Sequence, residues 1–148
     1  MQDDNETRRQ ETTTEDLLGR LRSGESLTEF LKDNSNAFLS ISLEEYIKAV
    51  IHDKKKTHAA LIRDSGINRR YFYDILSGQR HPERSYVLRL MLALKLSFQD
   101  AQWLLKATGY PQLYVRNRRD TVVVYALERG LGVRECNAML EKIDLEPI

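Results

Sequence analysis

The stretch Lys56–Pro82, KTHAALIRDSGINRRYFYDILSGQRHP, decides the fold of this chain. It predicts two short helices joined by a tight turn. Thr57 is expected to cap the first helix and Gly66 to end it, because glycine readily adopts the left-handed backbone that stops a helix. Asn68 is expected to cap a second helix, Arg69–Ser77. The pattern therefore indicates a helix-turn-helix unit.

The second helix of this unit separates apolar from polar side chains. Its spacing places three apolar residues on the face toward the core, namely Phe72, Ile75 and Leu76. Arg69 and Arg70 occupy its first turn, where two cations at the positive end of the helix dipole are unfavourable without an anion. Arginine suits guanine edges and phosphates, and such a helix can lie in a DNA major groove. This favours DNA binding.

The same stretch resembles the helix-turn-helix of phage Cro and repressor proteins, the XRE family, over residues 43–96. The residues that match the family pattern are Thr57, His58, Leu61, Ile62, Gly66, Ile67, Asn68, Ser77, Gly78, Arg80 and Pro82. His58 departs from it, since family members often have glutamine there. The resemblance implies an all-α, lambda-repressor-like fold and a transcriptional regulator that reads a double-stranded operator, as a homodimer on a two-fold site.

The resemblance also implies that Arg69, Arg70 and Asp74 reach the bases. Asp74 can accept a hydrogen bond from cytosine or pair with Arg70 one turn earlier, and the pairing is favoured. Tyr71 and Tyr73 can touch a phosphate or a thymine methyl, or be packed and half-buried instead. The complete candidate DNA-binding set is Lys56, Thr57, His58, Asn68, Arg69, Arg70, Tyr71, Tyr73, Asp74 and Arg80.

Further basic residues lie near this set. Lys54–Lys56 precede the first helix of the pair, and Arg80 and His81 follow the second, at places that border the DNA backbone in related folds. A third basic group contains Arg116, Arg118 and Arg119. That group can touch flanking DNA or pair with the acidic N-terminal segment, and we favour the internal role.

Charge is distributed unevenly along the 148 residues, although the net charge is only +1. Residues 1–42 carry −4, residues 43–110 carry +5 and residues 111–148 are neutral. Because neutralising phosphates supplies much of the affinity for DNA, a positive surplus on the helix-turn-helix segment supports the DNA-binding interpretation.

The chain is expected to have four parts. Residues 1–13 are polar and lack an apolar anchor, which predicts a disordered tail. Residues 14–42 are expected to form an N-terminal helical segment, residues 43–109 the DNA-binding domain and residues 110–148 a C-terminal helical extension. The sequence predicts no strand.

Local signals place the remaining helices. Thr14 is expected to cap a helix that runs to Arg22. Ser26 and Glu29 are expected to form the capping box of a second helix. Ser42 and Glu45 are expected to form another capping box, at the start of a helix that runs to about Asp53. A further helix is expected from about Ser85 to Leu94. The β-rich run TVVVY, residues 121–125, is interpreted as helix that Asp120 caps.

That interpretation depends on an internal repeat with an offset of 35 residues. The run VLRL at 87–90 aligns with VVVY at 122–125, and Leu104-Leu105 with Met139-Leu140. Each copy predicts a helix, a short turn and a helix. Since a helix pair buries its apolar face only against a neighbour, the second copy is expected to dock on the first.

The sequence offers little for catalysis. Its three histidines lack a second metal-ligand cluster, and no phosphate-binding loop or nucleophile elbow is present, so we expect no enzyme, metal or cofactor. The lone Cys136 is expected to be buried. Without a signal peptide or a long apolar run, the protein is expected in the cytoplasm of a bacterial or phage-type system, at the nucleoid when bound to DNA, and not in a membrane.

An alternative function remains open. The helix-turn-helix can be a scaffold for an adaptor or antitoxin-like protein that binds a protein partner through its N-terminal or C-terminal helices. The aromatic run YFY at 71–73, and Trp103 and Tyr110, motivate this alternative, because aromatic residues are enriched in protein interfaces.

Overall fold

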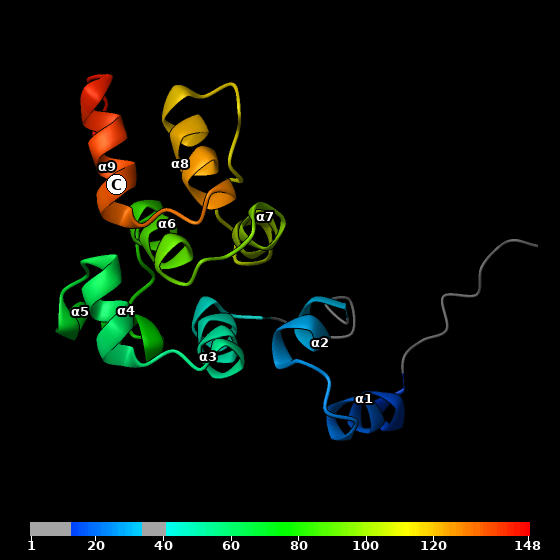
Figure 1. Ribbon diagram of the computed structural model, residues 1–148. Helices are drawn as coiled ribbons and strands as arrows, with labels where there is room; N and C mark the ends of the chain where they lie inside the picture. Colours follow the sequence, from blue (N-terminus) through cyan, green and yellow to red (C-terminus); the bar gives the residue numbers. More distant parts are fainter. Residues whose placement is uncertain (1–12, 34–40) are drawn as a thin grey trace, which may run out of the picture.

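A computed structural model describes residues 13–33 and 41–148, and these residues form helices and no strands (Figure 1). The expected all-α class is therefore confirmed for the described chain. The predicted disordered tail falls almost wholly on residues 1–12, which lie outside the described residues.

Two short helices open the described chain. α1 (Thr14–Arg22) is capped by Thr13, whose hydroxyl accepts a hydrogen bond from the Asp16 amide at 3.2 Å. The predicted cap, Thr14, is wrong by one position, because both threonines can cap and the preceding one has the extended backbone that a cap needs. α2 (Leu27–Asp33) buries Phe30.

Asp53, near the end of α3 (Leu43–Lys54), holds the start of α2. Its carboxylate accepts hydrogen bonds from the amides of Leu27 and Thr28 and from the hydroxyls of Ser26 and Thr28. α3 itself begins with the predicted capping box of Ser42 and Glu45. The long helix α3 thus anchors the N-terminal segment.

The centre of the molecule is α6 (Arg84–Ala93), which packs against α4 (His58–Ser65), α8 (Arg118–Glu128) and α9 (Val133–Lys142). Four consecutive residues, Leu90–Ala93, are at most 2% exposed, so the last turn of this helix is buried around its circumference. The predicted helix began and ended one residue later. α5 (Arg69–Leu76) and α7 (Phe98–Ala107) flank this core (Figure 1).

The β-rich run 121–125 lies inside α8, as the repeat predicted. α8–α9 follows α6–α7 with the expected offset, since α7 begins 35 residues before α9 and both pairs turn through a left-handed residue, Lys95 or Gly130. The second hairpin packs on the first. The repeat is therefore a structural one. Burial of Cys136 is also confirmed, and it raises the pKa of the thiol to about 11.

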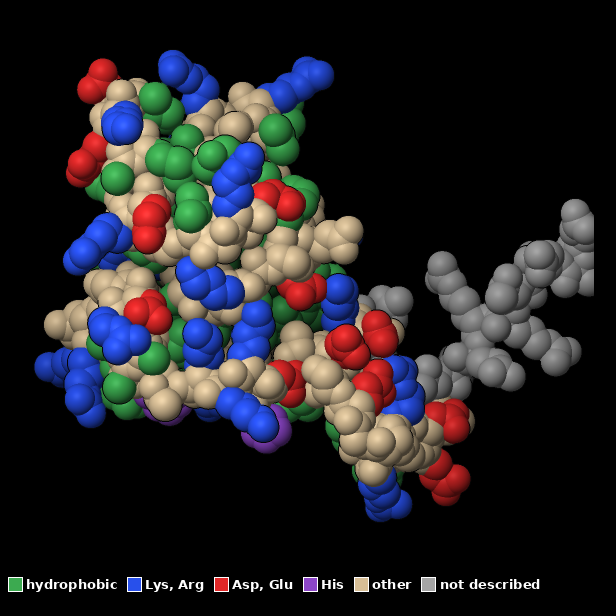
Figure 2. Space-filling view, in the orientation of Figure 1, with side chains coloured by type: hydrophobic (Ala, Val, Ile, Leu, Met, Phe, Trp, Pro, Cys, Tyr) green, Lys and Arg blue, Asp and Glu red, His purple; other side chains and the backbone are tan. Residues whose placement is uncertain are grey.

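Acidic and basic side chains are separated on the surface as they are along the sequence. Acidic side chains gather over α1 and α2, whereas Lys and Arg side chains are numerous around α4 and α5 (Figure 2). None of the helices in the described ranges is both long and apolar enough to cross a membrane.

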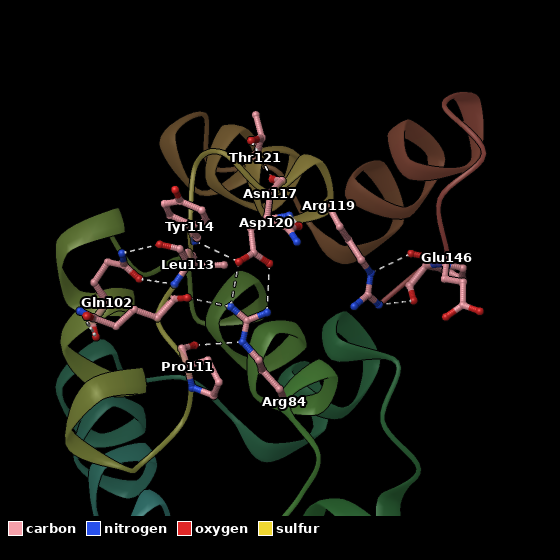
Figure 3. Close-up of polar contacts among 12 residues, drawn as sticks. Arg84, Gln102, Pro111, Leu113, Tyr114, Asn117, Arg119, Asp120, Thr121 and Glu146 are labelled. Carbon is pink, nitrogen blue, oxygen red and sulfur yellow. Dashed lines mark hydrogen bonds and ion pairs between the residues drawn. The ribbon is translucent and has the colours of Figure 1, made fainter.

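An arginine at the start of α6 joins the two hairpins. Arg84 donates hydrogen bonds to the carbonyl oxygens of Pro111 and Gln112, at 3.0 and 3.1 Å, and to both carboxylate oxygens of Asp120, at 3.0 and 3.1 Å (Figure 3). Asp120 was predicted to cap α8, and this is wrong. Asn117 is the cap, and the buried Asp120 sits one turn inside the helix, where it pairs with Arg84.

Arg119 repeats this contact at the expected offset of 35 residues. It donates to the carbonyl oxygens of Glu146 and Pro147, at 3.0 and 2.7 Å (Figure 3). The favoured internal role of its basic cluster is thus observed for Arg119, but with C-terminal carbonyls and not with the acidic N-terminal segment. Arg116 and Arg118 are exposed.

An amide side chain closes each hairpin in the same way. The Gln102 side chain exchanges two hydrogen bonds with the backbone of Leu113, and Asn137, 35 residues later, exchanges two with the backbone of Ile148. Leu113 and Ile148 are each 4% exposed. Each repeat therefore consists of two helices and a short tail that packs back on them.

Candidate nucleic-acid interface

α4 begins and ends where the sequence predicted. The Thr57 hydroxyl accepts a hydrogen bond from the Ala60 amide at 3.1 Å, so the Thr57 side chain is engaged in capping. Gly66 ends the helix at φ 65°, a left-handed conformation that costs glycine little. Both signals are local, which explains why they could be read from the sequence.

The turn between α4 and α5 is held from inside. Ile67 is 2% exposed, as expected for the apolar residue of the turn. The fully buried Ser65 was not anticipated. Its hydroxyl accepts from the Ile67 amide at 3.3 Å and donates to the Ile62 carbonyl at 3.4 Å. These contacts fix the angle at which α5 leaves the turn.

α5 begins at Asn68, whose side-chain oxygen accepts from the amides of Arg70 and Tyr71, at 2.9 and 3.4 Å. It ends at Leu76, one residue before the predicted end. The predicted apolar face is confirmed, because Phe72, Ile75 and Leu76 are buried. The opposite face therefore points away from the core.

Arg69, Arg70 and Tyr73 are exposed on that opposite face. The Arg69 guanidinium carbon lies 5.8 Å from the Tyr73 ring centre, within the range of a cation–π contact. Neither arginine has a carboxylate partner among the described residues. Two unneutralised cations thus stand at the positive end of the α5 dipole, where an anion is favoured.

His58 lies beside this face at the start of α4. Its exposed ring meets the rings of Phe72 and Tyr73 at centroid distances of 5.8 and 5.6 Å. These edge contacts bring His58 and Tyr73 together on one surface. An imidazole N–H there can donate to a phosphate.

Asp74 pairs with Arg80, at 3.7 Å between Oδ2 and Nε, and not with Arg70 as we favoured from the sequence. The reason is the chain direction after α5, since the segment that follows Gly78 turns back and carries Arg80 alongside the helix. The Arg80 guanidinium carbon also lies 5.6 Å from the Tyr71 ring centre. Arg80 is therefore oriented by an aromatic face and a carboxylate.

The two tyrosines of α5 have different surroundings. Tyr71 is half-buried, and its ring lies 4.6 Å from that of Tyr86 on α6. Burial, together with the neighbouring Tyr86, raises the pKa of Tyr71, so its hydroxyl is protonated at neutral pH and can donate. Packing, one of the two alternatives for Tyr71, is thus observed, whereas Tyr73 is 38% exposed.

A hollow of about 600 Å³ lies between α5 and α6. Arg70, Asp74 and Arg80 line it together with Tyr86 and Arg89. Sequence reasoning missed the last two, because they belong to α6 and only the tertiary packing brings them beside α5. One hydrogen-bond donor of Arg89 is already engaged, since its Nε donates to the Ile148 carbonyl at 3.0 Å.

The flanking basic residues are not equivalent. Lys54 Nζ donates to the Lys95 carbonyl at 3.1 Å, and burial lowers the pKa of this lysine. His81 stacks on Tyr110 with ring centres 4.9 Å apart. Lys56 is half-buried beside the exposed Lys55. Of the residues expected to contact the DNA backbone, Lys54, Arg80 and His81 therefore already have partners within the protein.

The arrangement has the donors that recognition of an anion needs. Within residues 13–33 and 41–148, no group of three His, Cys, Asp or Glu side chains is placed to hold a metal ion.

No family model matches the chain, and no curated protein or solved structure is significantly similar to it.

Proposed function

We propose that this protein is a sequence-specific double-stranded DNA-binding transcriptional regulator with a lambda-repressor-like helix-turn-helix of the XRE type. The observation that carries the proposal is the pair Arg69 and Arg70, exposed at the start of α5 without a carboxylate partner among the described residues. An eight-residue helix is about 12 Å long, which a major groove accommodates.

We assign different tasks to the residues around α5 from where their side chains lie. Arg69, Arg70 and Asp74 would face base edges, since arginine pairs with guanine and a carboxylate accepts from cytosine. Lys56, His58, Tyr73 and Arg80 lie at the flanks and would contact the backbone, which sets position more than sequence. The Asp74–Arg80 pair would orient both side chains before DNA binds.

Electrostatics supports the same surface. The surplus of +5 is confined to residues 43–110, and the two segments on either side of it are acidic or neutral. Binding should therefore weaken as salt rises, because phosphate neutralisation releases counterions. We further propose that the protein acts in a bacterial or phage-type cytoplasm, as a homodimer on a two-fold operator.

The test is selection from a random double-stranded DNA pool at near-physiological salt, followed by sequencing. We expect a recurring motif, and the double variant Arg69→Ala/Arg70→Ala should lose it. The matched control is Arg129→Ala/Arg134→Ala, which removes two exposed arginines from α9 and the residue after α8. If the control loses the motif as well, only non-specific charge was measured.

A folded wild-type protein that recovers no motif would overturn the proposal. It would favour the second candidate, an adaptor or antitoxin-like protein that binds a protein partner. Tyr125 and Ile143 support this candidate, because they are exposed on the C-terminal hairpin. Apolar partner binding would persist at high salt, whereas DNA binding would not.

A further inference from the structure

The hollow between α5 and α6 carries a surplus of positive charge. It measures about 600 Å³, a volume typical of small-molecule sites. Its charged lining consists of Arg70, Arg80 and Arg89 together with one carboxylate, that of Asp74. Three positive formal charges and one negative charge give this lining a net charge of +2. The α5–α6 hollow therefore favours an anion, and an anion with two charges would neutralise it.

Tyrosine rings hold two of the three arginines in place. The Arg80 guanidinium carbon lies 5.6 Å from the centre of the Tyr71 ring. The Arg89 guanidinium carbon lies at the same distance from the centre of the Tyr86 ring. The two rings contact each other, with centres 4.6 Å apart. Guanidinium groups that are oriented before a ligand arrives lose less entropy when they bind it.

The lining also has hydrogen-bond donors that the fold does not use. In the part of the chain that the structure describes, neither the exposed Arg70 nor Arg89 pairs with a side-chain carboxylate. The Arg89 Nε donates to the Ile148 carbonyl, which leaves the two terminal nitrogens of that side chain. The Tyr71 hydroxyl is a further donor, because its raised pKa keeps it protonated at neutral pH. Guanidinium forks and hydroxyls suit the oxygens of a phosphate group.

We propose that the α5–α6 hollow binds the phosphate group of a small phosphate monoester, a nucleoside monophosphate or a sugar phosphate. A phosphate monoester carries a charge of about −1.5 to −2 at neutral pH, which matches the +2 of the lining. A phosphodiester of the DNA backbone carries a single charge and leaves the hollow half-neutralised. Charge therefore favours the free monoester over a backbone phosphate as the occupant.

The ligand would regulate DNA binding, because the hollow shares Arg70, Asp74 and Arg80 with the surface assigned to the operator. A phosphate group held there occupies donors that the operator needs, so the two ligands should compete. This consequence rests on the proposed function, whereas binding of the monoester does not. The first test therefore contains no DNA.

That test is isothermal titration calorimetry of the full chain at constant ionic strength, with adenosine 5′-monophosphate and with glucose 6-phosphate. We expect saturable binding at one site per chain by at least one of them. Binding by both would show that the phosphate alone is recognised, and binding by one would identify the source of the phosphate. Uncharged adenosine should bind at least about 10-fold more weakly, since it lacks the charge-assisted hydrogen bonds.

Variants locate the binding site. Arg80→Gln and Arg89→Gln should each weaken monoester binding by at least about 10-fold. The matched control is Arg129→Gln, which removes a guanidinium 3.7 Å from the Tyr125 ring centre, outside the hollow, and should leave binding unchanged. Arg80 is exposed, so its variant tests the site even if loss of the Arg89–Ile148 contact disturbs the fold.

Three results would overturn the inference. The first is that neither monoester binds at concentrations up to about 10 mM, which would leave an affinity too weak for a built site. The second is an equal loss in Arg80→Gln and in the control Arg129→Gln. The third is adenosine binding as tightly as its monophosphate, because the phosphate would then contribute nothing.

Competition with DNA separates this inference from the operator proposal. A saturating concentration of the bound monoester should lower the apparent operator affinity by at least about 10-fold. An unchanged operator affinity would overturn the regulatory role. If the monoester binds and no operator is recovered, the DNA proposal alone fails. If an operator is recovered and neither monoester binds, the inference about the hollow alone fails.

Discussion

The arginines of α5 and those of the C-terminal repeats show two opposite uses of one side chain. Arg84 and Arg119 are saturated by backbone carbonyls, and Arg84 also by Asp120. Arg69 and Arg70 have no carboxylate partner among the described residues and stand where the helix dipole disfavours cations. The first pair is satisfied within the fold, whereas the second is the pair that the proposed function assigns to DNA.

This difference separates stability from recognition. Removing Arg84 leaves the buried carboxylate of Asp120 without its charged partner, which destabilises the fold. Removing an unpaired arginine leaves nothing unsatisfied. The two regions should therefore respond in opposite ways to the same substitution, and the predictions below test how complete the separation is.

The largest effect is expected for Arg84→Ala. It strands Asp120, whose side chain is 10% exposed, and removes the hydrogen bonds from Arg84 to the Pro111 and Gln112 carbonyls. Breaking one partner of a buried ion pair costs about 3–5 kcal/mol. Urea denaturation should show this loss, and Arg118→Ala, an exposed neighbour, should change stability by less than about 0.5 kcal/mol. Equal losses in the two variants would refute the anchoring role.

The next effect concerns α5. Arg69→Ala/Arg70→Ala should lower operator affinity by about 100-fold, since each arginine–base contact contributes about 1–3 kcal/mol. The thermal midpoint should stay the same or rise, because two cations leave the positive end of the helix dipole. Thermal melts followed by circular dichroism check this. A large fall in the midpoint would show that these arginines also stabilise the fold.

Helix starts and stops in this chain follow short-range rules, and the sequence predicted them well. Ser42 with Glu45, Thr57, Gly66 and Asn68 all occupy the predicted capping positions, because each cap satisfies amides within a few residues. The repeat was also visible, since its spacing is a property of the sequence alone.

Apart from the α1 cap, which is Thr13 and not Thr14, the errors concern contacts that helical spacing alone does not determine. Aspartate often caps helices, yet Asp120 pairs with Arg84, 36 residues away. Asp74 was assigned to Arg70 by helical spacing, but the chain reversal after α5 brings Arg80 closer. No feature of the sequence around Tyr86 indicates that it lies beside α5. The packing of α6 determines the contacts of Arg84 and Tyr86, and the chain reversal after α5 determines that of Asp74.

Asp53 gives a further contrast, because it is a carboxylate that accepts its hydrogen bonds from another segment of the chain. Burial alone would raise its pKa, but hydrogen bonds from Thr28, Ser26 and Leu27 outweigh burial and lower it. A lowered folded-state pKa means that the stabilisation is present above the ordinary value of 3.8 and is lost as pH falls through the folded-state pKa.

Asp53→Ala should therefore cost about 1 kcal/mol at neutral pH, as for the loss of a helix cap, and less at pH 3. Hydrogen exchange of the α2 amides measures this directly, because the effect should be confined to that helix. His52→Ala is the control. It removes the exposed imidazole whose Nδ1 lies 3.6 Å from the Asp53 carboxylate, and it leaves the four hydrogen bonds that Asp53 accepts. A loss that does not diminish in acid would refute the assignment.

The smallest effect compares the two repeats with each other. Gly109 follows the end of α7 with φ 84°, and Asp144, 35 residues later, has φ 58° at the equivalent place after α9. A left-handed conformation is strained for aspartate and not for glycine. Asp144→Gly should thus stabilise the protein by about 0.5–1 kcal/mol, whereas Glu141→Gly, inside α9, should destabilise it by about 1 kcal/mol. Chemical denaturation measures both stability changes. If they have opposite signs, both hairpins end in the same left-handed turn. Equal losses would show that the second repeat does not need the left-handed turn, and the equivalence of the two repeats would then be limited to their helices.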